Sequence, residues 1–367
     1  MTDPAEGRRA GRAERILLAP DSFKGTLTAS EVIAALAGPL REAGYEVAAC
    51  PLADGGEGTA EALLAAAGGR RVEADAHDPL GRPLRSWYAL LADVERAGMA
   101  SGARSQPRRP SGTGAAGFET AAVEAAAASG LSLIVPSERD PETASTYGTG
   151  ELIVAAADRV QTILVGVGGS ATTDGGRGAL QAIRDGGGLA GARIVCLCDV
   201  RIPWELASEV FAPQKGADES AVARLSAGLE ELATRLPRDP RGVARTGAGG
   251  GLAGGLWAQC GAELVDGARF VADRAGVDHR IGGAVAVLTG EGRLDATTLE
   301  GKTVSEVAHR ASRAGVPVHA VVGEDATSAA ERRALGLSSV RQASTAEEIA
   351  SAAAALARDL RTQFSRR

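Results

Sequence analysis

The chain has 367 residues, 44% of them hydrophobic, and a formal net charge of −6 at pH 7. This length allows two domains with ample core, and the negative charge disfavours nucleic acids and acidic membranes as partners because both would repel the protein. No apolar run is long enough for a membrane-spanning helix, no signal peptide opens the sequence, and the four cysteines sit in or beside apolar segments. We therefore expect a cytoplasmic protein whose cysteines are small buried side chains.

The first part of the chain alternates predicted strands and helices. Residues 1–14 are polar and rich in arginine, which is typical of a disordered lead-in. Strands are predicted at 15–19 and 46–50, and helices at 31–42 and 60–67, with a polar loop after each strand. This order implies parallel strands whose following loops share one sheet edge, where open α/β sheets bind their ligands.

The pattern changes from residue 70 onward. Strands are predicted at 71–76 and 84–92, a mobile surface loop at 98–117, and an alanine-rich helix at 119–128. The further elements expected in this region are a helix at 151–158, a strand at 162–165, a helix at 177–183, a strand at 193–198, a helix at 220–236, and a short strand and helix within 263–273.

The first pattern resumes at residue 284. The elements expected here are strands at 284–289, 316–322 and 339–342 and helices at 303–314, 327–335 and 345–362. Together with 15–69 they give five β-α units. We therefore predict an α/β protein of two domains, in which a flavodoxin-like parallel-sheet domain (15–69 plus 284–367) is split by an inserted α/β domain with a mixed sheet (70–283).

A glycine-rich loop after the strand at 162–165 is the centre of this arrangement. Its glycines and hydroxyl residues include Gly166, Gly168, Gly169, Ser170 and Thr172. Glycine lets main-chain N–H groups approach a ligand, and the following helix adds partial positive charge, so the loop suits a phosphate. It matches neither the P-loop nor the dinucleotide fingerprint, because no Lys-Ser/Thr follows the glycines. A tight turn without a ligand is the alternative, but other glycine-rich loops, such as that of Gly249, Gly250 and Gly251, favour phosphate contact.

Lysine is rare in this chain. Only Lys24, Lys215 and Lys302 are lysines among 40 cationic residues, and each lies next to a glycine. Because arginine serves nearly everywhere else, a retained lysine is a candidate compact charge for a phosphate. Lysines left on loops by chance are the alternative.

Carboxylates follow several of the predicted strands. They are Asp21, Asp54, Glu57, Asp174, Asp199, Glu291 and Asp295, and several of them are flanked by glycines and a hydroxyl. Each could be an acid on a solvated turn or a helix cap. Together with the lysines and the glycine loops, however, they supply what phosphoryl transfer from a nucleotide requires: N–H groups for phosphates, a cation, and carboxylates for Mg²⁺.

These motifs together resemble the type I glycerate kinases. The resemblance is carried by residues 19–25, 53–59, 145–153, 166–176, 198–200, 211–217 and 289–295. It implies a two-domain α/β fold and ATP- and Mg²⁺-dependent phosphorylation of D-glycerate, with 2-phosphoglycerate as the favoured product. The connections at 185–192 and 200–211 are shorter than is usual in the family, which bears on the shape of the inserted domain.

The resemblance and the pattern together suggest a role for each residue. Catalytic roles are expected for Lys24, Asp21, Asp174 and Asp199, and the last two would also bind Mg²⁺. Substrate contacts are expected from Ser22, Asp54, Glu57, Lys215, Glu291 and Arg293. Contacts with the nucleotide are expected from Gly166, Gly168, Gly169, Ser170, Thr172, Gly249, Gly250 and Gly251.

Two other functions stay open on the sequence. One is a kinase of another small hydroxy acid, because nothing in the sequence measures the length of the substrate. The other is a non-catalytic sensor of nucleotides or organic acids. A flavodoxin-type electron carrier is disfavoured because only 3% of the residues are aromatic. A homodimer is left open.

Overall fold

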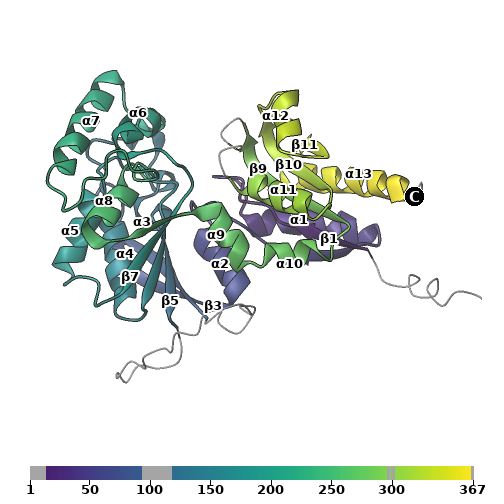
Figure 1. The fold of residues 1–367 in the computed structure, drawn as a ribbon, viewed down its shortest axis with the longest axis horizontal. Coiled ribbons are helices and arrows are strands. Elements are labelled where there is room, and N and C mark those ends of the chain that lie inside the picture. The colour runs from purple at the N-terminus through teal and green to yellow at the C-terminus, as the bar shows by residue number, and fades with distance from the viewer. Residues whose placement is uncertain (1–13, 93–117, 296–297, 299–301, 365–367) are drawn as a thin grey trace, which may run out of the picture. The chain divides into compact units, whose positions relative to one another are not determined.

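The computed structural model describes residues 14–92, 118–295, 298 and 302–364. The predicted lead-in, apart from Glu14, and the predicted loop at 98–117 lie outside these residues. The chain forms two units (Figure 1): unit 1 comprises Met1–Leu52 with Gly276–Arg367, and unit 2 comprises Ala53–Ala275.

Unit 1 is built on a five-stranded parallel sheet. Its strands are β1 (Arg15–Leu18), β2 (Glu46–Ala49), β9 (Ala286–Leu294), β10 (Val318–Asp325) and β11 (Ser339–Gln342). They lie in the order β11-β10-β9-β1-β2, and all neighbours pair in parallel. Numbered along the chain within this unit, the order is 2-1-3-4-5, which is that of flavodoxin-like sheets. The predicted flavodoxin-like domain is confirmed.

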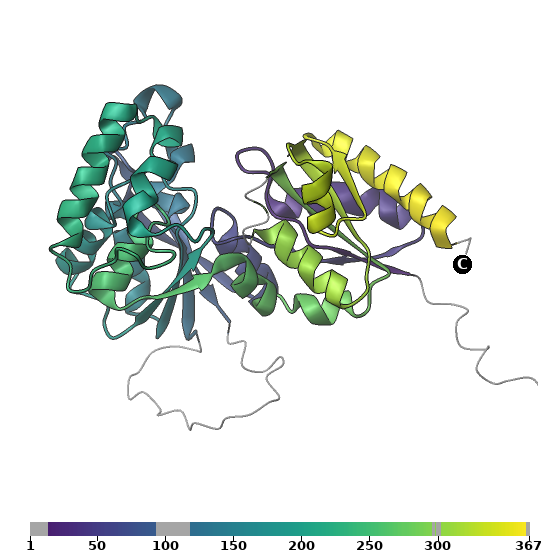
Figure 2. The ribbon, with the colours of Figure 1, turned by 45° about the horizontal axis from the view of Figure 1, so that its top comes forward.

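Helices cover both faces of this sheet. They are α1 (Ala29–Glu42), α10 (Val277–Ile281), α11 (Thr303–Arg313), α12 (Ala329–Ala334) and α13 (Ala346–Phe364). Helices α1 and α13 pack together on one face, while α10 and α11 lie on the other (Figure 2). Helix α1 begins where Thr28 and Glu31 form a capping box, and its apolar residues at helical spacing, such as Val32, Leu36 and Leu40, are buried in the core.

Unit 2 is built on a six-stranded mixed sheet. Its strands are β3 (Gly69–His77), β4 (Pro83–Leu91), β5 (Thr120–Glu124), β6 (Thr162–Gly166), β7 (Arg193–Cys198) and β8 (Glu263–Asp266). They lie in this order across the sheet; β3, β4 and β5 pair antiparallel, and β5 to β8 pair in parallel. The predicted mixed sheet is confirmed, and the loops that follow β5, β6 and β7 share one edge.

The helices of unit 2 also cover two faces. They are α2 (Thr59–Ala67), α3 (Ala126–Ser129), α4 (Tyr147–Ala157), α5 (Arg177–Asp185), α6 (Ala207–Phe211), α7 (Glu219–Ala233), α8 (Leu252–Cys260) and α9 (Gly267–Arg274), with short 3-10 helices η3 (Leu131–Leu133), η4 (Pro136–Glu138), η5 (Trp204–Leu206) and η6 (Pro213–Lys215). Helices α2 and α9 pack on one face, and α4, α5 and α8 on the other (Figure 1). In the described part of the chain, no helix combines the length and apolarity needed to cross a membrane.

One predicted element of unit 2 is wrong. The alanine-rich stretch at 119–128 was expected to be a helix, but its first half is strand β5 and only a short helix, α3, follows. Strand β5 lies between β4 and β6, and its residues Ala121, Ala122 and Val123 are buried. Pairing with β4 on one side and β6 on the other outweighs the high intrinsic helix propensity of alanine.

The division between the units also differs from the predicted domain boundaries. The prediction ended the first segment of the flavodoxin-like domain at residue 69, whereas the structure ends it at Leu52 and resumes it at Gly276. Helix α2 therefore belongs to unit 2, where it packs against β4, β5 and α9. The β-α pattern alone could not show on which sheet α2 packs.

Gly150→Ala is expected to destabilise unit 2 by about 1–3 kcal/mol because it overpacks the contact of α4 with α5. A Cβ atom at Gly150 would lie 2.5 Å from the carbonyl oxygen of Ala179 and 2.7 Å from the Cβ of Ala182. The matched control is Gly228→Ala in α7, where a Cβ meets nothing within 4 Å and should stabilise the helix by roughly 0.5–1 kcal/mol. Urea unfolding measures both changes; equal stability of the two variants would contradict this packing.

Candidate active site

Three loops of unit 2 meet at the carboxyl edge of its parallel strands. We call residues 53–58 the acidic loop, residues 166–176 the glycine loop, and residues 246–251 the second glycine loop. The N–H of Gly168 donates to the carbonyl oxygen of Gly55 over 3.1 Å. A Cβ at Gly168 would lie 2.8 Å from the Cα of Gly56 and 3.1 Å from Oδ2 of Asp199. Glycine is therefore required here so that two backbones and a carboxylate can come together.

The second glycine loop packs directly against the glycine loop. The N–H of Gly175 donates to the carbonyl oxygen of Gly250 over 3.1 Å. A Cβ at Gly250, whose φ is +65°, would lie 2.0 Å from the carbonyl oxygen of Thr172, and one at Gly249 would lie 2.7 Å from that of Val167. This packing alone requires glycine at positions 249 and 250, without contact to a ligand. The second glycine loop therefore supports the glycine loop.

Trp204 lies beneath both loops and is fully buried. A Cβ at Gly175 or at Gly254 would lie within 2.6 Å of its ring. The indole N–H donates to the carbonyl oxygen of Leu229 in α7 over 3.1 Å, and the main-chain N–H of Trp204 donates to the Thr246 hydroxyl over 2.9 Å. Trp204 therefore joins the two glycine loops to α7.

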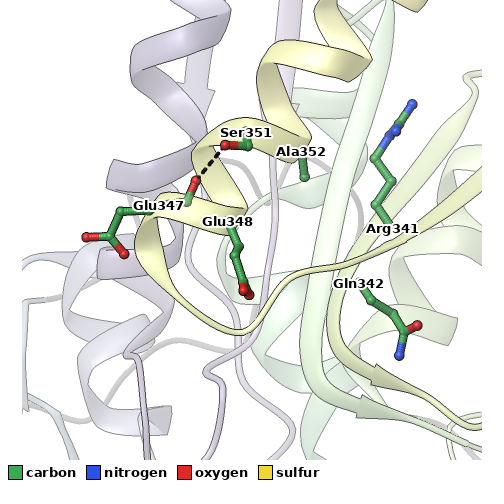
Figure 3. Close-up of a pocket in the computed structure, with 6 residues that line it drawn as sticks. All are labelled: Arg341, Gln342, Glu347, Glu348, Ser351 and Ala352. Carbon is green, nitrogen blue, oxygen red and sulfur yellow. Dashed lines mark hydrogen bonds between the residues drawn. The ribbon is translucent and has the colours of Figure 1, made fainter.

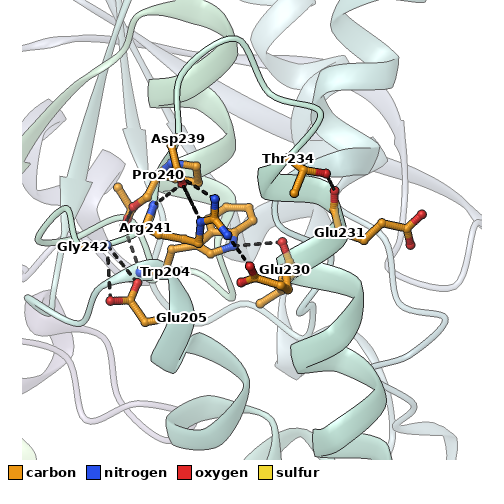
Figure 4. Close-up of polar contacts among 11 residues, drawn as sticks. Trp204, Glu205, Glu230, Glu231, Thr234, Asp239, Pro240, Arg241 and Gly242 are labelled. Carbon is orange, nitrogen blue, oxygen red and sulfur yellow. Dashed lines mark hydrogen bonds and ion pairs between the residues drawn. The ribbon is translucent and has the colours of Figure 1, made fainter.

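Ion pairs at the surface hold the segment that leads into the second glycine loop. The guanidinium of Arg241 pairs with Asp239 over 2.6 Å and also with Glu230 of α7 (Figure 4). The N–H of the next residue, Gly242, donates to Glu205 over 3.1 Å. These contacts tie residues 239–242 to the same helix that accepts the indole N–H of Trp204.

The glycine loop carries hydrogen-bond donors that the protein itself does not use. The main-chain N–H groups of Gly169, Ser170, Thr172 and Thr173 make no hydrogen bond within the described part of the chain. The hydroxyls of Thr172 and Thr173 are also buried without a partner there. Buried polar groups of proteins normally have partners. This donor set therefore fits an anionic group, and a nucleotide phosphate is such a group.

Lys215, the last residue of η6, is buried against this loop. Its ammonium donates to the carbonyl oxygen of Thr172 over 2.5 Å and to the hydroxyl of Ser170 over 3.3 Å, and the residue is 3% exposed. Burial lowers the pKa of Lys215 to about 8, and the charges of Asp174 and Asp199 oppose that shift only in part. The structure thus brings Lys215 together with Ser170 and Thr172, as a compact charge next to the unused N–H groups.

Asp174 and Asp199 have different surroundings. The carboxylate of Asp174 accepts four hydrogen bonds: two from the N–H and hydroxyl of Thr146, at 3.0 and 2.8 Å, and two from the N–H groups of Gly176 and Gly178, at 2.9 and 3.0 Å. It therefore caps α5 and holds the start of α4, and these bonds argue against the metal role expected for it. Asp199 is half-buried beside Gly168 instead.

The described residues contain no group of three or more His, Cys, Asp or Glu side chains placed to hold a metal. Mg²⁺ in phosphoryl-transfer sites needs fewer protein ligands, because one or two carboxylates usually suffice when phosphate oxygens and water complete its coordination. Asp199 next to the unused N–H groups fits that kind of site.

The two acids of the acidic loop also differ. Asp54 is buried, and its Oδ1 accepts the N–H of Gly56 over 3.1 Å, so it shapes the turn. The side chain of Glu57 is exposed. A Cβ at Gly267, where α9 begins, would lie 2.1 Å from the carbonyl oxygen of Asp54, so this loop is also fixed from α9.

Unit 1 gathers a second group of predicted residues where β1 and β9 end. Asp21 accepts the hydroxyl of Thr303 and the N–H of Ser22, each over 2.6 Å, and Glu291 accepts the hydroxyl of Thr298 over 2.8 Å. Strands β1 and β9 are neighbours from which the chain proceeds in opposite directions, which is the switch point where flavodoxin-like sheets bind ligands.

Arg293 and Lys24 lie on the surface of unit 1. The guanidinium of Arg293 is 58% exposed and pairs with Glu324 over 3.1 Å and with Asp295 over 3.4 Å. Lys24 is exposed in the loop after β1, next to the buried Phe23. Among the described residues of unit 1, the ion pairs of Arg293 are with Glu324 and Asp295 and not with Asp21 or Glu291.

A shallow hollow in unit 1 contains none of the predicted residues. It is lined by Arg341, Gln342, Glu347, Glu348, Ser351 and Ala352 (Figure 3). Glu348 accepts the N–H of Ser344 over 2.7 Å at the start of α13, and Arg341 pairs with Asp359 over 2.5 Å. Its charged groups therefore serve the fold, and the hollow is not the candidate site.

Sequence reasoning missed several residues that shape these groups. They are Glu124, Thr146, Trp204 and Thr303. Thr146 and Thr303 stand in hydroxyl-rich segments at helix starts, a signal that capping rules could have used. Trp204 gave no signal, because nothing in a sequence says what an indole ring packs on.

Comparisons with known proteins agree with one another. The profile of the "Glycerate kinase family" matches residues 16–185 and 187–366. The glycerate kinase of Haemophilus influenzae is 37% identical over 352 residues, which cover 84% of this chain and 85% of that protein. The glycerate 2-kinase of Escherichia coli is 35% identical over 347 residues, with 84% and 85% covered. A crystal structure from Salmonella typhimurium LT2, of a protein provisionally named glycerate kinase 2, matches with a TM-score of 0.73 and 33% identity over 96% of this chain and 100% of that one.

Asp174→Asn is expected to lower the free energy of unfolding by about 1–3 kcal/mol. The NH₂ group of asparagine would face N–H groups from which the carboxylate oxygen accepts hydrogen bonds. Asp158→Asn is the matched control: Asp158 is exposed at the end of α4, and this change should stay within about 0.5 kcal/mol. Urea unfolding measures both. An Asp174→Asn protein as stable as the control would show that this carboxylate is not a structural cap.

Proposed function

This chain belongs to the glycerate kinase family, and we propose that it transfers the γ-phosphoryl group of ATP to D-glycerate, with Mg²⁺ as the metal and 2-phosphoglycerate as the product. The relatives named for glycerate phosphorylation support the substrate, and one of them is named for the 2-position. The cytoplasmic location and the homodimer stay predictions.

The observation that carries the nucleotide part of the proposal is the donor set of the glycine loop. The N–H groups of Gly169, Ser170, Thr172 and Thr173 have no acceptor among the described residues, and the Lys215 ammonium lies beside them. Such groups would bind phosphate oxygens and stabilise the negative charge that spreads over the transferring group in the transition state. They are held in place by the second glycine loop and Trp204, so little reorganisation is needed when the phosphate binds.

Asp199 is the residue proposed to hold Mg²⁺ in unit 2. When bound there, the metal would neutralise charge on the phosphate oxygens and fix their orientation. Asp199 is positioned for this by the end of β7 and by Gly168, where a side chain would collide with it. Asp174 is not assigned this role, because its carboxylate is occupied by four protein donors.

The remaining predicted roles are proposals for individual residues. Asp54 and Glu57 of the acidic loop are proposed to contact the substrate, and Glu57 is the better placed because its side chain is exposed. Lys24 and Asp21 are proposed for catalysis. Ser22, Glu291 and Arg293 are proposed for substrate contact; Arg293 has the weakest support because two carboxylates already pair with it.

The product of the reaction tests the proposed function directly. Protein incubated with ATP, Mg²⁺ and D-glycerate should release ADP, and phosphorus NMR should show the resonance of 2-phosphoglycerate. A 3-phosphoglycerate resonance would overturn the proposed position. Binding of both ligands in calorimetry without release of ADP would favour a sensor, and turnover only with another small hydroxy acid would overturn glycerate as the substrate.

Lys215→Met is expected to lower kcat roughly 10²-fold or more, by analogy with the loss of a preorganised charge donor. In the unchanged protein, activity should fall as the pH rises through about 8, because the ammonium loses its proton there. Lys215→Arg keeps a charge that does not titrate in this range, so its residual activity should lack that alkaline decline. Wild-type kcat in Lys215→Met would remove Lys215 from the mechanism.

A further inference from the structure

Glu124 is a buried carboxylate that the proposed mechanism does not use. It is the last residue of β5, it pairs in register with Gly166, where the glycine loop begins, and it is 6% exposed. Glu124 was not among the residues predicted for the site, because the stretch that contains it was expected to be a helix.

The two oxygens of Glu124 bind the first turn of α2. Oε1 accepts the N–H of Ala60 over 2.6 Å, and Oε2 accepts the N–H of Gly58 over 3.2 Å. Gly58 is the N-cap residue of α2 and has no side chain to accept these bonds itself. Glu124 therefore supplies the cap from another strand and ties the end of the acidic loop to β5.

The acidic loop is in turn in contact with the glycine loop. The carbonyl oxygen of Gly55 accepts the N–H of Gly168 over 3.1 Å, and Gly56 packs against Gly168. Between these contacts and the cap, the loop carries Glu57. A change at Glu124 would therefore move Glu57 relative to the glycine loop without touching either of them.

The surroundings of Glu124 disfavour its charge. No cation lies within ion-pair distance of it among the described residues. Burial raises the pKa of Glu124 to about 7; the N–H groups of Ala60 and Gly58 lower it in part, and the charges of Glu61 and Glu57 raise it further. Glu61 from α2 and Glu57 from the acidic loop are the charged groups that face it, while β5, β6 and α3 present uncharged side chains on this side.

The direction of this pKa shift shows that the ionised form of Glu124 does not stabilise the fold. The pKa in the folded protein lies above the ordinary value of 4.5, so the stability that Glu124 contributes is present below that value and is lost as the pH rises through about 7. A buried carboxylate kept at a cost in stability is typical of a functional position.

We propose that Glu124 is a positioning residue whose two oxygens fix the acidic loop against the glycine loop and so place Glu57 for the substrate. Opening of the first turn of α2 would expose this carboxyl and return its pKa toward 4.5, so loss of the proton above about pH 7 favours the open loop. The link to glycerate rests on the proposed function; the loosening of the loop does not.

Hydrogen exchange tests the positioning without any activity. In the unchanged protein, amides of residues 55–62 should exchange roughly tenfold faster at pH 8 than at pH 6, after correction for intrinsic rates. Glu124→Gln should exchange fast at both pH values, because its NH₂ group faces an N–H donor. Equal protection of the two proteins at pH 6 would overturn the proposal, whether or not glycerate is the substrate.

Kinetics test the link to the substrate. At saturating Mg²⁺ and ATP, the KM for glycerate should rise as the pH rises through about 7 in the unchanged protein and be roughly tenfold higher at pH 6 in Glu124→Gln, with a smaller change in kcat. Titration of ATP itself would persist in both proteins, so the difference between their profiles is the readout. If exchange responds as expected but no glycerate is phosphorylated, the proposed function fails and the positioning role stands.

Glu61→Gln is the matched control, because it removes a charge that faces Glu124 and leaves its hydrogen bonds in place. Glu61 is half-exposed and pairs with Arg71 over 3.5 Å. The pH above which the loop loses protection should move to a lower value in this variant, and protection at pH 6 should be unchanged. If Glu124→Gln does not fold, Glu61→Gln provides the test. An unchanged pH for the transition in amide protection of that variant would overturn the proposal.

Discussion

The candidate site depends on how the peptide group of Thr172 is held. Its carbonyl oxygen accepts the buried ammonium of Lys215 over 2.5 Å, and the backbone of Gly250 lies so close to the same oxygen that a Cβ there would approach to 2.0 Å. Because Lys215 and Gly250 hold this carbonyl, the neighbouring main-chain N–H groups of Thr172 and Thr173 are also held in place. No atom in the described part of the chain accepts a hydrogen bond from them. The Lys215 ammonium and the second glycine loop therefore hold the unused N–H donors of the glycine loop in position.

The carboxylates of the chain divide into two kinds around this arrangement. Asp174, Asp54 and Glu124 bind main-chain N–H groups and give the loops their shape, whereas Asp199 is half-buried beside Gly168. Phosphoryl transfer depends mainly on positioning and electrostatics, so acids that only shape loops still matter for rate. A member of the glycerate kinase family thus needs more acids than those that touch a ligand.

The sequence was most informative where one physical signal dominates. Short apolar runs bounded by polar or glycine-rich segments predicted β1, β6 and β7. It failed where tertiary packing decides: the alanines of β5 suit a helix equally well, and α2 follows β2 in the chain but packs on the other sheet. The predicted roles of Gly249 and Gly250 were based on phosphate contact, yet contact with the backbones of Val167 and Thr172 already requires glycine there.

The most direct test of this account observes the amides of the glycine loop. In protein labelled with ¹⁵N-threonine, the resonances of Thr172 and Thr173 should shift when a non-hydrolysable ATP analogue and Mg²⁺ are added, because their N–H groups gain phosphate acceptors. Thr120 and Thr162, which pair at the starts of β5 and β6 and so at the opposite end of these strands from this loop, should stay in place. If Thr172 and Thr173 do not move at saturating nucleotide, the glycine loop does not bind the phosphates and the account is contradicted.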